Sequence, residues 1–580
     1  MHKRIKTIER IFILLTAGIF MPICLLCGCG ESVPADADVI GTDNLENEEE
    51  SGDGKLSEEK LERLTKGDVH MSAGQLADFA SGVTMRYDEA SESLICTFEM
   101  PRIPGSDDAY LYLFALESYE NEDKLSSEPV SSGIKGTTCE IAFPYTEDYL
   151  FERFVPALYM DGRYVPLSQG VYLTNPEALA GNRDPYPEIS SKKGLLLDPT
   201  MLGTEKLTDL GVKHAIYNIP LSHIMGVTTD ETFPTITYTY KGKDYVFNGA
   251  AINGYDGLFR YLTEMGMCST AIILNDWNDE YPELIHPDAR QKNDDAYYYM
   301  ANAAEEEGVI TLEAVANFLT ERYSGGEYGM VYNWVIANEI NQQRTWNYMD
   351  TQDVGYYAQE FEKVFRIFYL AARSSYANAK VYFSVDHIWN REQGNGKDFF
   401  NARDVIEQFN IMAATHGNYD WGIAIHPYPD PLTRVNYWSQ EYSKTQEAQT
   451  LTIMNLSVLT DFLKQEAYLD SHGEVRSITI TELGFSSQSG EKLQAAAFAY
   501  CYLIVDANPY IEAFIMNRQT DAPEEVAQGL AFGIYRYDQS EKYIKDVFRY
   551  IDTDKASEYT EFMLNILKAD NLEEALGWAE

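Results

Sequence analysis

Two glutamates each follow directly on a short apolar run, and carboxyl groups placed in this way can cleave glycosidic bonds. Glu339 ends the run Trp334-Val-Ile-Ala-Asn-Glu339, and Glu482 ends the run Ile478-Thr-Ile-Thr-Glu482. Runs of this length are typical of buried strands, so both side chains are expected at strand ends. One protonated carboxyl can donate to a leaving oxygen while an ionised one attacks the anomeric carbon, and a separation of about 5–5.5 Å gives retention of configuration.

The elements that would position these glutamates repeat along the C-terminal two thirds of the chain. From about residue 192, short apolar runs alternate with helical stretches, which is typical of βα units. Strands are expected at 195–197, 214–219, 270–274, 332–337, 381–385, 422–425, 478–481 and 513–516, with an inserted hairpin at 235–248. This pattern over 191–580 predicts an α/β fold, a (β/α)8 TIM barrel, whose active site lies at the C-terminal strand ends. Glu339 and Glu482 follow the fourth and seventh strands, which face each other across such a barrel.

Three motifs at these strand ends resemble those of the clan A retaining glycoside hydrolases, especially the cellulase-like members. Asn338-Glu339 resembles the fourth-strand motif that carries the acid/base. The segment from Ile478 to Phe485 resembles the seventh-strand nucleophile motif, and His426-Pro-Tyr428 resembles the sixth-strand His-x-Tyr motif. The same region, roughly 190–580, is also similar to a bacterial domain family of unknown function.

The resemblance implies a retaining glycosidase that hydrolyses a polysaccharide or an oligosaccharide. By it, Glu339 is the acid/base and Glu482 the nucleophile. Tyr428 would hydrogen-bond the nucleophile, and Asn338 would bind the 2-hydroxyl of the sugar. The rival hypothesis is a surface lipoprotein that binds glycans on the same barrel without cleaving them.

Other residues that follow strand ends are expected to bind the substrate. His426 ends the sixth strand, Asn517 follows the eighth, and Trp277 and Trp389 follow the third and fifth. Indole rings offer apolar faces on which the C–H faces of sugars can stack. Clan A enzymes usually carry a tryptophan after the eighth strand, where this chain has Asn517-Arg518. The innermost sugar site is therefore expected to be built differently here.

The N-terminal residues have the pattern of a bacterial lipoprotein signal. Four Lys and Arg residues within the first ten precede an apolar stretch over 11–26, which suits a secretory signal better than a membrane-spanning helix. The stretch ends in Leu26-Cys-Gly-Cys29, which resembles a lipobox, so residues 1–28 are predicted to be removed and Cys29 to be lipidated. Plain signal-peptidase cleavage and an uncleaved anchor are the alternatives. The prediction places the protein at the bacterial cell surface, anchored to the membrane.

Between the signal and the barrel, the composition changes twice. Residues 29–65 are predicted to be an acidic, disordered tether, because 31–60 hold eleven acidic residues against two lysines. Residues 66–190 show short alternating runs between turn residues, which predict a small all-β sandwich domain. This domain has no tryptophan, so a spacer is favoured over a sugar-binding module. Its Cys96 and Cys139 could pair or remain separate buried thiols.

Composition and motifs argue against several other functions. The formal net charge of −46 repels nucleic-acid phosphates and anionic lipid headgroups, so no nucleic-acid partner is expected. The chain lacks the motifs of phosphate-binding loops, zinc proteases and serine hydrolases. No metal and no cofactor are expected, because hydrolysis by two carboxyl groups needs neither. The expected partner is a carbohydrate substrate, bound by a monomer.

Overall fold

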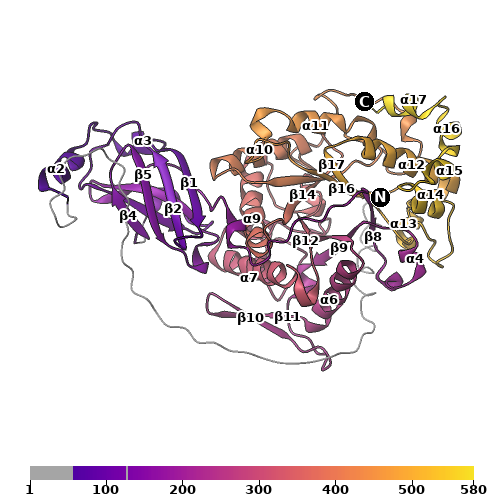
Figure 1. The fold of residues 1–580 in the computed structure, drawn as a ribbon, viewed down its shortest axis with the longest axis horizontal. Coiled ribbons are helices and arrows are strands. Elements are labelled where there is room, and N and C mark those ends of the chain that lie inside the picture. Colours follow the sequence, from indigo (N-terminus) through magenta and orange to yellow (C-terminus); the bar gives the residue numbers. More distant parts are fainter. Residues whose placement is uncertain (1–55, 126–127, 580) are drawn as a thin grey trace.

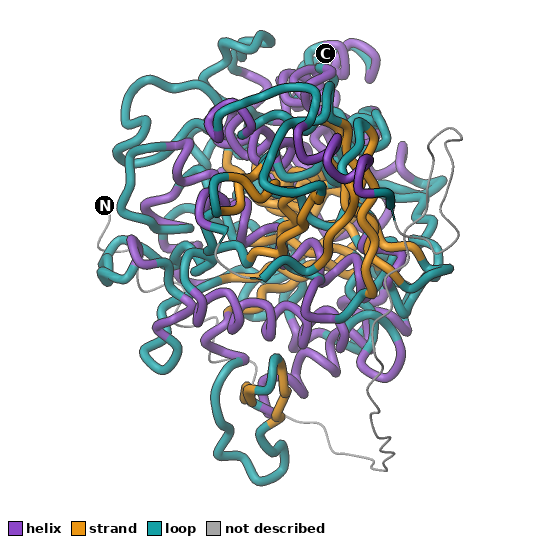
Figure 2. The backbone as a smooth tube through the Cα atoms, turned by 90° about the vertical axis from the view of Figure 1, so that its left-hand side faces the viewer, coloured by secondary structure: helices purple, strands orange, loops and turns teal. Residues whose placement is uncertain are grey.

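The chain forms a small β-sandwich followed by a large barrel in the computed structural model, which describes residues 56–125 and 128–579 (Figure 1). The barrel is a closed ring of parallel strands with helices around it, and the separate N-terminal sheets are antiparallel. The predicted fold class is therefore confirmed. Seen from the sandwich end, most strands lie towards the centre of the molecule, with helices and loops around them (Figure 2).

Every predicted barrel strand is present, within a few residues of its expected bounds. The strands are β8 (Lys193–Leu196), β9 (His214–Pro220), β12 (Cys268–Leu274), β13 (Asn333–Ile336), β14 (Lys380–Asp386), β15 (Trp421–His426), β16 (Ile478–Leu483) and β17 (Ile511–Met516). Their hydrogen-bonded order, β12-β13-β14-β15-β16-β17-β8-β9, closes on itself. Because β14 and β15 separate β13 from β16, the ends of β13 and β16 oppose each other across the barrel mouth.

The inside of the barrel is a packed apolar core and not a pore. Alternate strand residues such as Ile216, Val335 and Ile515 form one buried cluster, as expected when strand side chains alternate between the two faces of a sheet. At the opposite end from the mouth, the Tyr186 hydroxyl donates to Asn333 Oδ1 over 2.9 Å. Because the interior is filled, a substrate can be bound only by the loops at the C-terminal strand ends, which form the mouth of the barrel.

Helices and one hairpin follow the strands around the barrel. The helices are α4 (Glu205–Thr208), α5 (Leu221–Ile224), α6 (Gly249–Glu264), α7 (Glu306–Arg322), α8 (Gln343–Trp346), α9 (Val354–Ser375), α10 (Ala402–Thr415), α11 (Ser457–Leu463), α12 (Glu491–Ala507), α13 (Pro523–Ala527), α14 (Ile544–Tyr550), α15 (Ala556–Thr560), α16 (Phe562–Leu567) and α17 (Leu572–Gly577). The predicted hairpin is confirmed as β10 (Ile236–Tyr240) paired with β11 (Lys243–Phe247).

Two antiparallel sheets make up the sandwich. One contains β1 (Ser81–Asp88), β2 (Ser93–Glu99) and β5 (Thr138–Pro144), and the other contains β3 (Tyr110–Leu116), β4 (Ser131–Ile134), β6 (Arg153–Met160) and β7 (Arg163–Pro166). Alternate residues of β2, including Leu94, Cys96 and Phe98, point into the shared core. Cys96 and Cys139 are buried free thiols, so the pairing alternative is not realised. Burial raises the pKa of Cys96 to about 12.

The prediction of a disordered tether is wrong for its last residues, which form helix α2 (Glu58–Lys66). The Ser57 side chain caps this helix by accepting the Lys60 N–H over 3.2 Å. Leu64 is buried, and its carbonyl accepts a hydrogen bond from Lys135 Nζ of the sandwich over 3.3 Å. The acidic composition of this segment suggested disorder, although it contains a helix with a capping serine at its start and a buried leucine, Leu64, in its last turn. Residues 1–55, with the predicted signal and Cys29, lie outside the described residues.

The β10–β11 hairpin connects the barrel to the sandwich through a cluster of charged groups. At its turn, Lys241 Nζ lies 2.7 Å from Glu117 Oε1 of the sandwich and 3.1 Å from Glu313 Oε2 of α7. Glu152, also from the sandwich, adds a third carboxyl group. Burial, and then the charge of Glu117, raises the pKa of Glu152 to about 9 and that of Glu313 to about 8. The cluster therefore holds protons that the unfolded chain would release.

The variant Glu152→Gln should make stability less sensitive to alkaline pH. A carboxyl with a raised folded pKa contributes most below its unfolded value of 4.5, and this contribution is lost as the pH rises to about 9. We expect the melting temperature of the parent to fall more steeply between pH 5 and 9 than that of Glu152→Gln, because the amide needs no proton. Circular dichroism melts measure this, with exposed Glu99→Gln as the control. Equal slopes for parent and Glu152→Gln would contradict the prediction.

Candidate active site

Glu339 lies just beyond β13 on a backbone held in an unusual conformation. Ala337 and Glu339 have φ angles of 63° and 40°, in the left-handed region that residues other than glycine rarely adopt. The Glu339 N–H donates to Ser384 Oγ of β14 over 3.1 Å, and the Ile340 N–H donates to the Ser384 carbonyl over 2.9 Å. Such a conformation costs about 1–3 kcal/mol per residue and persists only where surrounding contacts enforce it, often at functional sites.

His426, the last residue of β15, connects the two glutamates. Its ring is fully buried, and Nδ1 lies 2.9 Å from Glu339 Oε1 and 3.9 Å from Glu482 Oε2. These two carboxyl oxygens therefore cannot be further apart than the sum of the two distances. His426 Nε2 lies 3.0 Å from Thr481 Oγ1 and 3.2 Å from Ser384 Oγ, which fixes the ring. The structure thus brings together the two glutamates that the sequence singled out.

Glu482 is held by two side chains from neighbouring strands. The Tyr428 hydroxyl donates to Glu482 Oε1 over 2.9 Å, and Asn517 Nδ2 donates to the same oxygen over 3.3 Å. Asn517 also donates to the Tyr428 hydroxyl oxygen over 3.1 Å, and its peptide bond to Arg518 is cis. The Glu482 side chain is 36% exposed, against 15% for Glu339. Glu482 is therefore the more accessible of the two carboxyl groups.

The electrostatic environments of the residues around the mouth differ. Burial, together with the charges of Asp386 and Glu482, raises the pKa of Glu339 against the opposing effect of His426. Burial disfavours the charged His426 ring, but its contact with Glu339 and the charge of Glu482 outweigh this and raise the His426 pKa. Burial and then the Glu482 charge raise the pKa of Tyr428, which stays a hydrogen-bond donor. Both members of the Glu339–His426 pair therefore keep their protons to a higher pH than isolated side chains would.

Asp386, at the end of β14, supports the loop that carries Glu339. It is buried and accepts hydrogen bonds from Asn341 Nδ2 over 2.6 Å and from Gln342 Nε2 over 2.7 Å. The Ile388 N–H donates to it as well, over 2.8 Å. Since Asn341 and Gln342 come shortly after Glu339 in the chain, these bonds fix the position of the loop.

The remaining residues predicted to bind substrate, Asn338, Trp277 and Trp389, differ in how far their side chains are exposed. Asn338 and Trp277 are partly exposed, and the Trp277 ring packs edge-on against Tyr299 with centroids 5.2 Å apart. Trp389 is fully buried and packs edge-on against Phe462. The prediction that Trp389 offers a sugar-stacking face is therefore wrong, because the chain after β14 turns back into the core.

An aromatic group at the mouth combines Trp346, which the sequence places on the active-site face, with tyrosines that were not identified from the sequence. Tyr298 packs on the apolar inside of the barrel, and the Trp346 ring lies 6.0 Å from it. Tyr297 stacks on Trp346 with centroids 4.9 Å apart and 21° between the rings. The run of three tyrosines at 297–299 is the sequence signal that could have revealed this group. Ser384, a polar residue inside an apolar strand, is a comparable signal for the support of Glu339.

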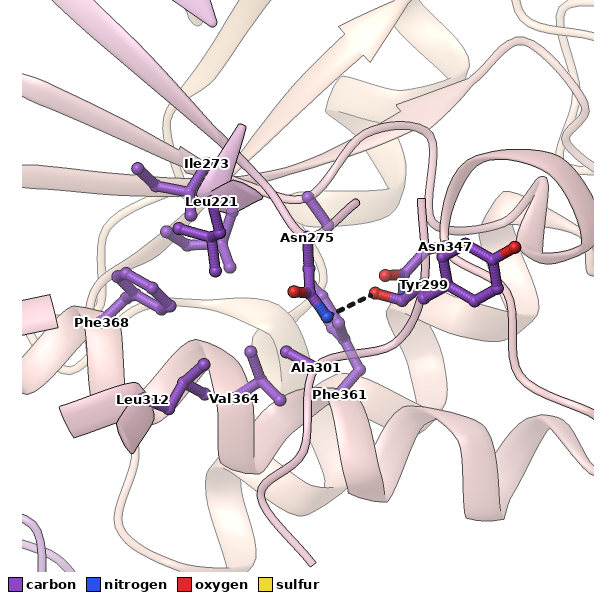
Figure 3. A pocket seen from close by; sticks show the side chains of 12 residues that line it. Leu221, Ile273, Asn275, Tyr299, Ala301, Leu312, Asn347, Phe361, Val364 and Phe368 are labelled. Carbon is purple, nitrogen blue, oxygen red and sulfur yellow. Dashed lines mark hydrogen bonds between the residues drawn. The ribbon is translucent and has the colours of Figure 1, made fainter. Parts of the chain in front are cut away.

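Asn275, directly after β12, fixes the loop that carries the three tyrosines at 297–299. Its Nδ2 donates to the carbonyls of Leu284 over 3.0 Å and Tyr299 over 3.2 Å. Figure 3 shows the side chain beside a cavity of about 20 Å³ lined mostly by apolar residues. This cavity is too small for a sugar, so Asn275 acts by positioning the loop and not by binding substrate.

Across residues 56–125 and 128–579, no group of three or more His, Cys, Asp or Glu side chains is arranged to hold a metal ion. Within the same ranges, no helix combines the length and the apolar character needed to cross a membrane.

Fold and site together define a (β/α)8 barrel protein with paired carboxyl groups at its mouth. The sequence profile of a family of unknown function, DUF5722, matches residues 185–575, and the chain belongs to this family. A search of curated proteins finds none whose sequence matches this chain.

Several solved structures are similar to this one. A family 39 glycoside hydrolase from Bacteroides cellulosilyticus WH2 has a TM-score of 0.41 and 15% identity, with 77% of each chain covered. The Ignisphaera aggregans GH53 catalytic domain has a TM-score of 0.39 and 12% identity, covering 64% of this chain and 98% of that one. A Bacteroides uniformis beta-glucuronidase has a TM-score of 0.36 and 10% identity, covering 84% of this chain. The chain spans 53% of the length of that glucuronidase.

Proposed function

We propose that this protein is a glycoside hydrolase that cleaves O-glycosidic bonds of a polysaccharide or oligosaccharide with retention of configuration. The observation that carries the proposal is the pair Glu339 and Glu482, set at opposed strand ends and joined through His426. Carboxyl groups lie about 5–5.5 Å apart in retaining enzymes and about 6.5–9.5 Å apart in inverting ones. The short path through one imidazole nitrogen favours the retaining arrangement.

In the first step, Glu482 attacks the anomeric carbon while Glu339 protonates the leaving oxygen. The bond from the anomeric carbon to this oxygen breaks, and a covalent glycosyl–Glu482 intermediate forms. Hydrogen bonds from Tyr428 and Asn517 orient Glu482 for the attack. The raised pKa of Glu339 suits the donation, because this carboxyl keeps its proton to a higher pH than an ordinary glutamate does.

In the second step, Glu339 acts as the base. Now ionised, it takes a proton from a water molecule, whose oxygen attacks the anomeric carbon and displaces Glu482. His426, 2.9 Å from Glu339 and with a raised pKa, stabilises the charge on Glu339 between the two steps. Two displacements at one carbon restore the original configuration.

Turnover on aryl glycosides and on plant, fungal and host glycans tests the proposal. We expect one sugar class to be released with its anomeric configuration retained, as proton NMR of the first product shows. The matched control is Glu482→Gln, which keeps the shape of the side chain and loses the nucleophile. If a glycan binds and neither protein releases product, the barrel is a binding protein and the proposal fails.

We also propose that the protein is a membrane-anchored lipoprotein of the cell surface, on the strength of the lipobox-like sequence before Cys29. Cys29→Ser should remain unprocessed or leave the membrane fraction, because acyl chains can no longer be attached. Cys27→Ser is the matched control and should behave like the parent. Fractionation with immunoblotting measures both. A Cys29→Ser protein that is processed and fractionates like the parent would refute the anchor.

A further inference from the structure

A hollow on the flank of the barrel brings together two tryptophans that are far apart in the sequence. Trp438 follows β15, and Trp578 lies near the C-terminus, yet both line a hollow of about 410 Å³. Its volume falls in the range of about 300–1,000 Å³ that is typical of small-molecule sites. The residues that line it are not those that hydrogen-bond to Glu339 or Glu482.

Contacts with the core fix both tryptophans in place. Trp438 packs edge-on against Tyr500 of α12, and its neighbour Tyr437 stacks on the same ring with 5° between the planes. Trp578 is partly buried and packs against the main hydrophobic core, and its backbone carbonyl accepts a hydrogen bond from Lys444 Nζ over 2.9 Å. The hollow is therefore formed in the folded chain and needs no ligand to assemble it.

The hollow combines apolar ring faces with exposed hydrogen-bonding groups. Trp438 and Trp578 are only partly buried, while Asn436, Ser439 and Lys568 are exposed on its walls. A sugar ring matches this lining, because its C–H face can pack on indole and its hydroxyls can bond to the few polar groups. A wholly apolar ligand would instead cover the Asn436 amide and the Lys568 ammonium without giving them partners.

Charge narrows the class of ligand. The formal net charge of the chain is −46, and Lys568 supplies a single positive charge to the lining. A polyanionic glycan would meet long-range repulsion from such a protein. A neutral glycan is unaffected, so it is the class that the hollow fits best.

We propose that this hollow is a second carbohydrate-binding site, which takes a segment of a neutral glycan chain. This binding site rests on the proposed function only for the class of ligand, a carbohydrate. Binding in the hollow requires neither Glu339 nor Glu482. Two of its walls come from segments that follow barrel strands of the candidate active site: Trp438 lies after β15, which ends at His426, and Leu493 lies in α12, after β16 with Glu482.

Affinity electrophoresis of the full chain tests this site. The Glu482→Gln protein is run through gels that contain β-glucan, galactomannan, arabinoxylan or starch, so that bound polymer is not cleaved. We expect retardation by at least one of them, and adding Trp578→Ala should weaken binding about tenfold through loss of an aromatic face. Asn436→Ala should weaken it less. Tyr537→Ala removes an aromatic ring that is 69% exposed and not part of the hollow, and should bind like its parent.

Each other outcome overturns the proposal. It fails if none of the four polysaccharides retards the protein. It also fails if Trp578→Ala and Asn436→Ala bind unchanged, which would place the bound glycan at the barrel mouth. Trp578→Phe guards against a folding defect, since it keeps an aromatic face and should retain most of the binding. Failure of the proposed hydrolysis is seen separately, as absence of product from the parent chain while retardation persists.

Discussion

Glu482→Ala should lower kcat by about 10⁴-fold or more on every substrate, because the covalent intermediate cannot form without the nucleophile. A 2-fluoro glycoside of the cleaved sugar should label Glu482 in the parent chain, and peptide mass spectrometry identifies the labelled residue. Tyr428→Phe is the matched comparison. It removes one hydrogen bond to Glu482 and leaves the carboxylate in place, so its loss should be far smaller.

Two results would contradict this assignment. One is a stable label on a residue other than Glu482 after treatment with the fluoro glycoside. The other is a Glu482→Ala protein that is rescued by azide with retained configuration, because external attack on the substrate itself inverts the anomeric carbon.

Glu339→Ala should have an effect that depends on the leaving group. With natural glycans, kcat should fall by about 10²–10⁴-fold, the usual contribution of general acid–base catalysis. A dinitrophenyl glycoside hardly needs protonation, so its first step should survive and the second step should limit turnover. Azide should then restore the rate and give a glycosyl azide of retained configuration, because azide attacks the intermediate without a base.

The pH profile supplies a second measurement on Glu339. The raised pKa of Glu339 keeps its proton in place up to a higher pH than usual, and activity should be lost as the pH rises through that value. The alkaline decline should disappear in Glu339→Ala assayed on the dinitrophenyl glycoside. An unchanged alkaline limb in that variant would assign the limb to another group.

Strand positions and the carboxyl pair were predictable because both are encoded locally. Each barrel strand is a short apolar run that ends at a polar residue, and the order of such runs limits the topology to a closed barrel. Glu339 and Glu482 stand next to their strands in the sequence, so the fold carries them to the mouth. Short strands with few large apolar residues, such as β4, gave no such signal.

Features that depend on the return of distant segments were not predictable. Trp389 looked like a surface platform because it follows a strand end, but its N–H donates to the Gln449 carbonyl over 3.0 Å, and this pairing draws it into the core. The contact between Tyr298 and Trp346 likewise joins loops that follow different strands. Neither arrangement leaves a local pattern in the sequence.

The packed inside of the barrel has a kinetic consequence for the proposed reaction. Tyr186 and the apolar cluster leave no passage along the barrel axis, so substrate, both products and the hydrolytic water share one route. In the second displacement water attacks the anomeric carbon from the face that the leaving group has vacated, so the departing fragment must first move away from that face. A second sugar that arrives first would accept the glycosyl group in place of water. Longer products at high substrate concentration are thus expected if the proposed covalent intermediate forms at this mouth.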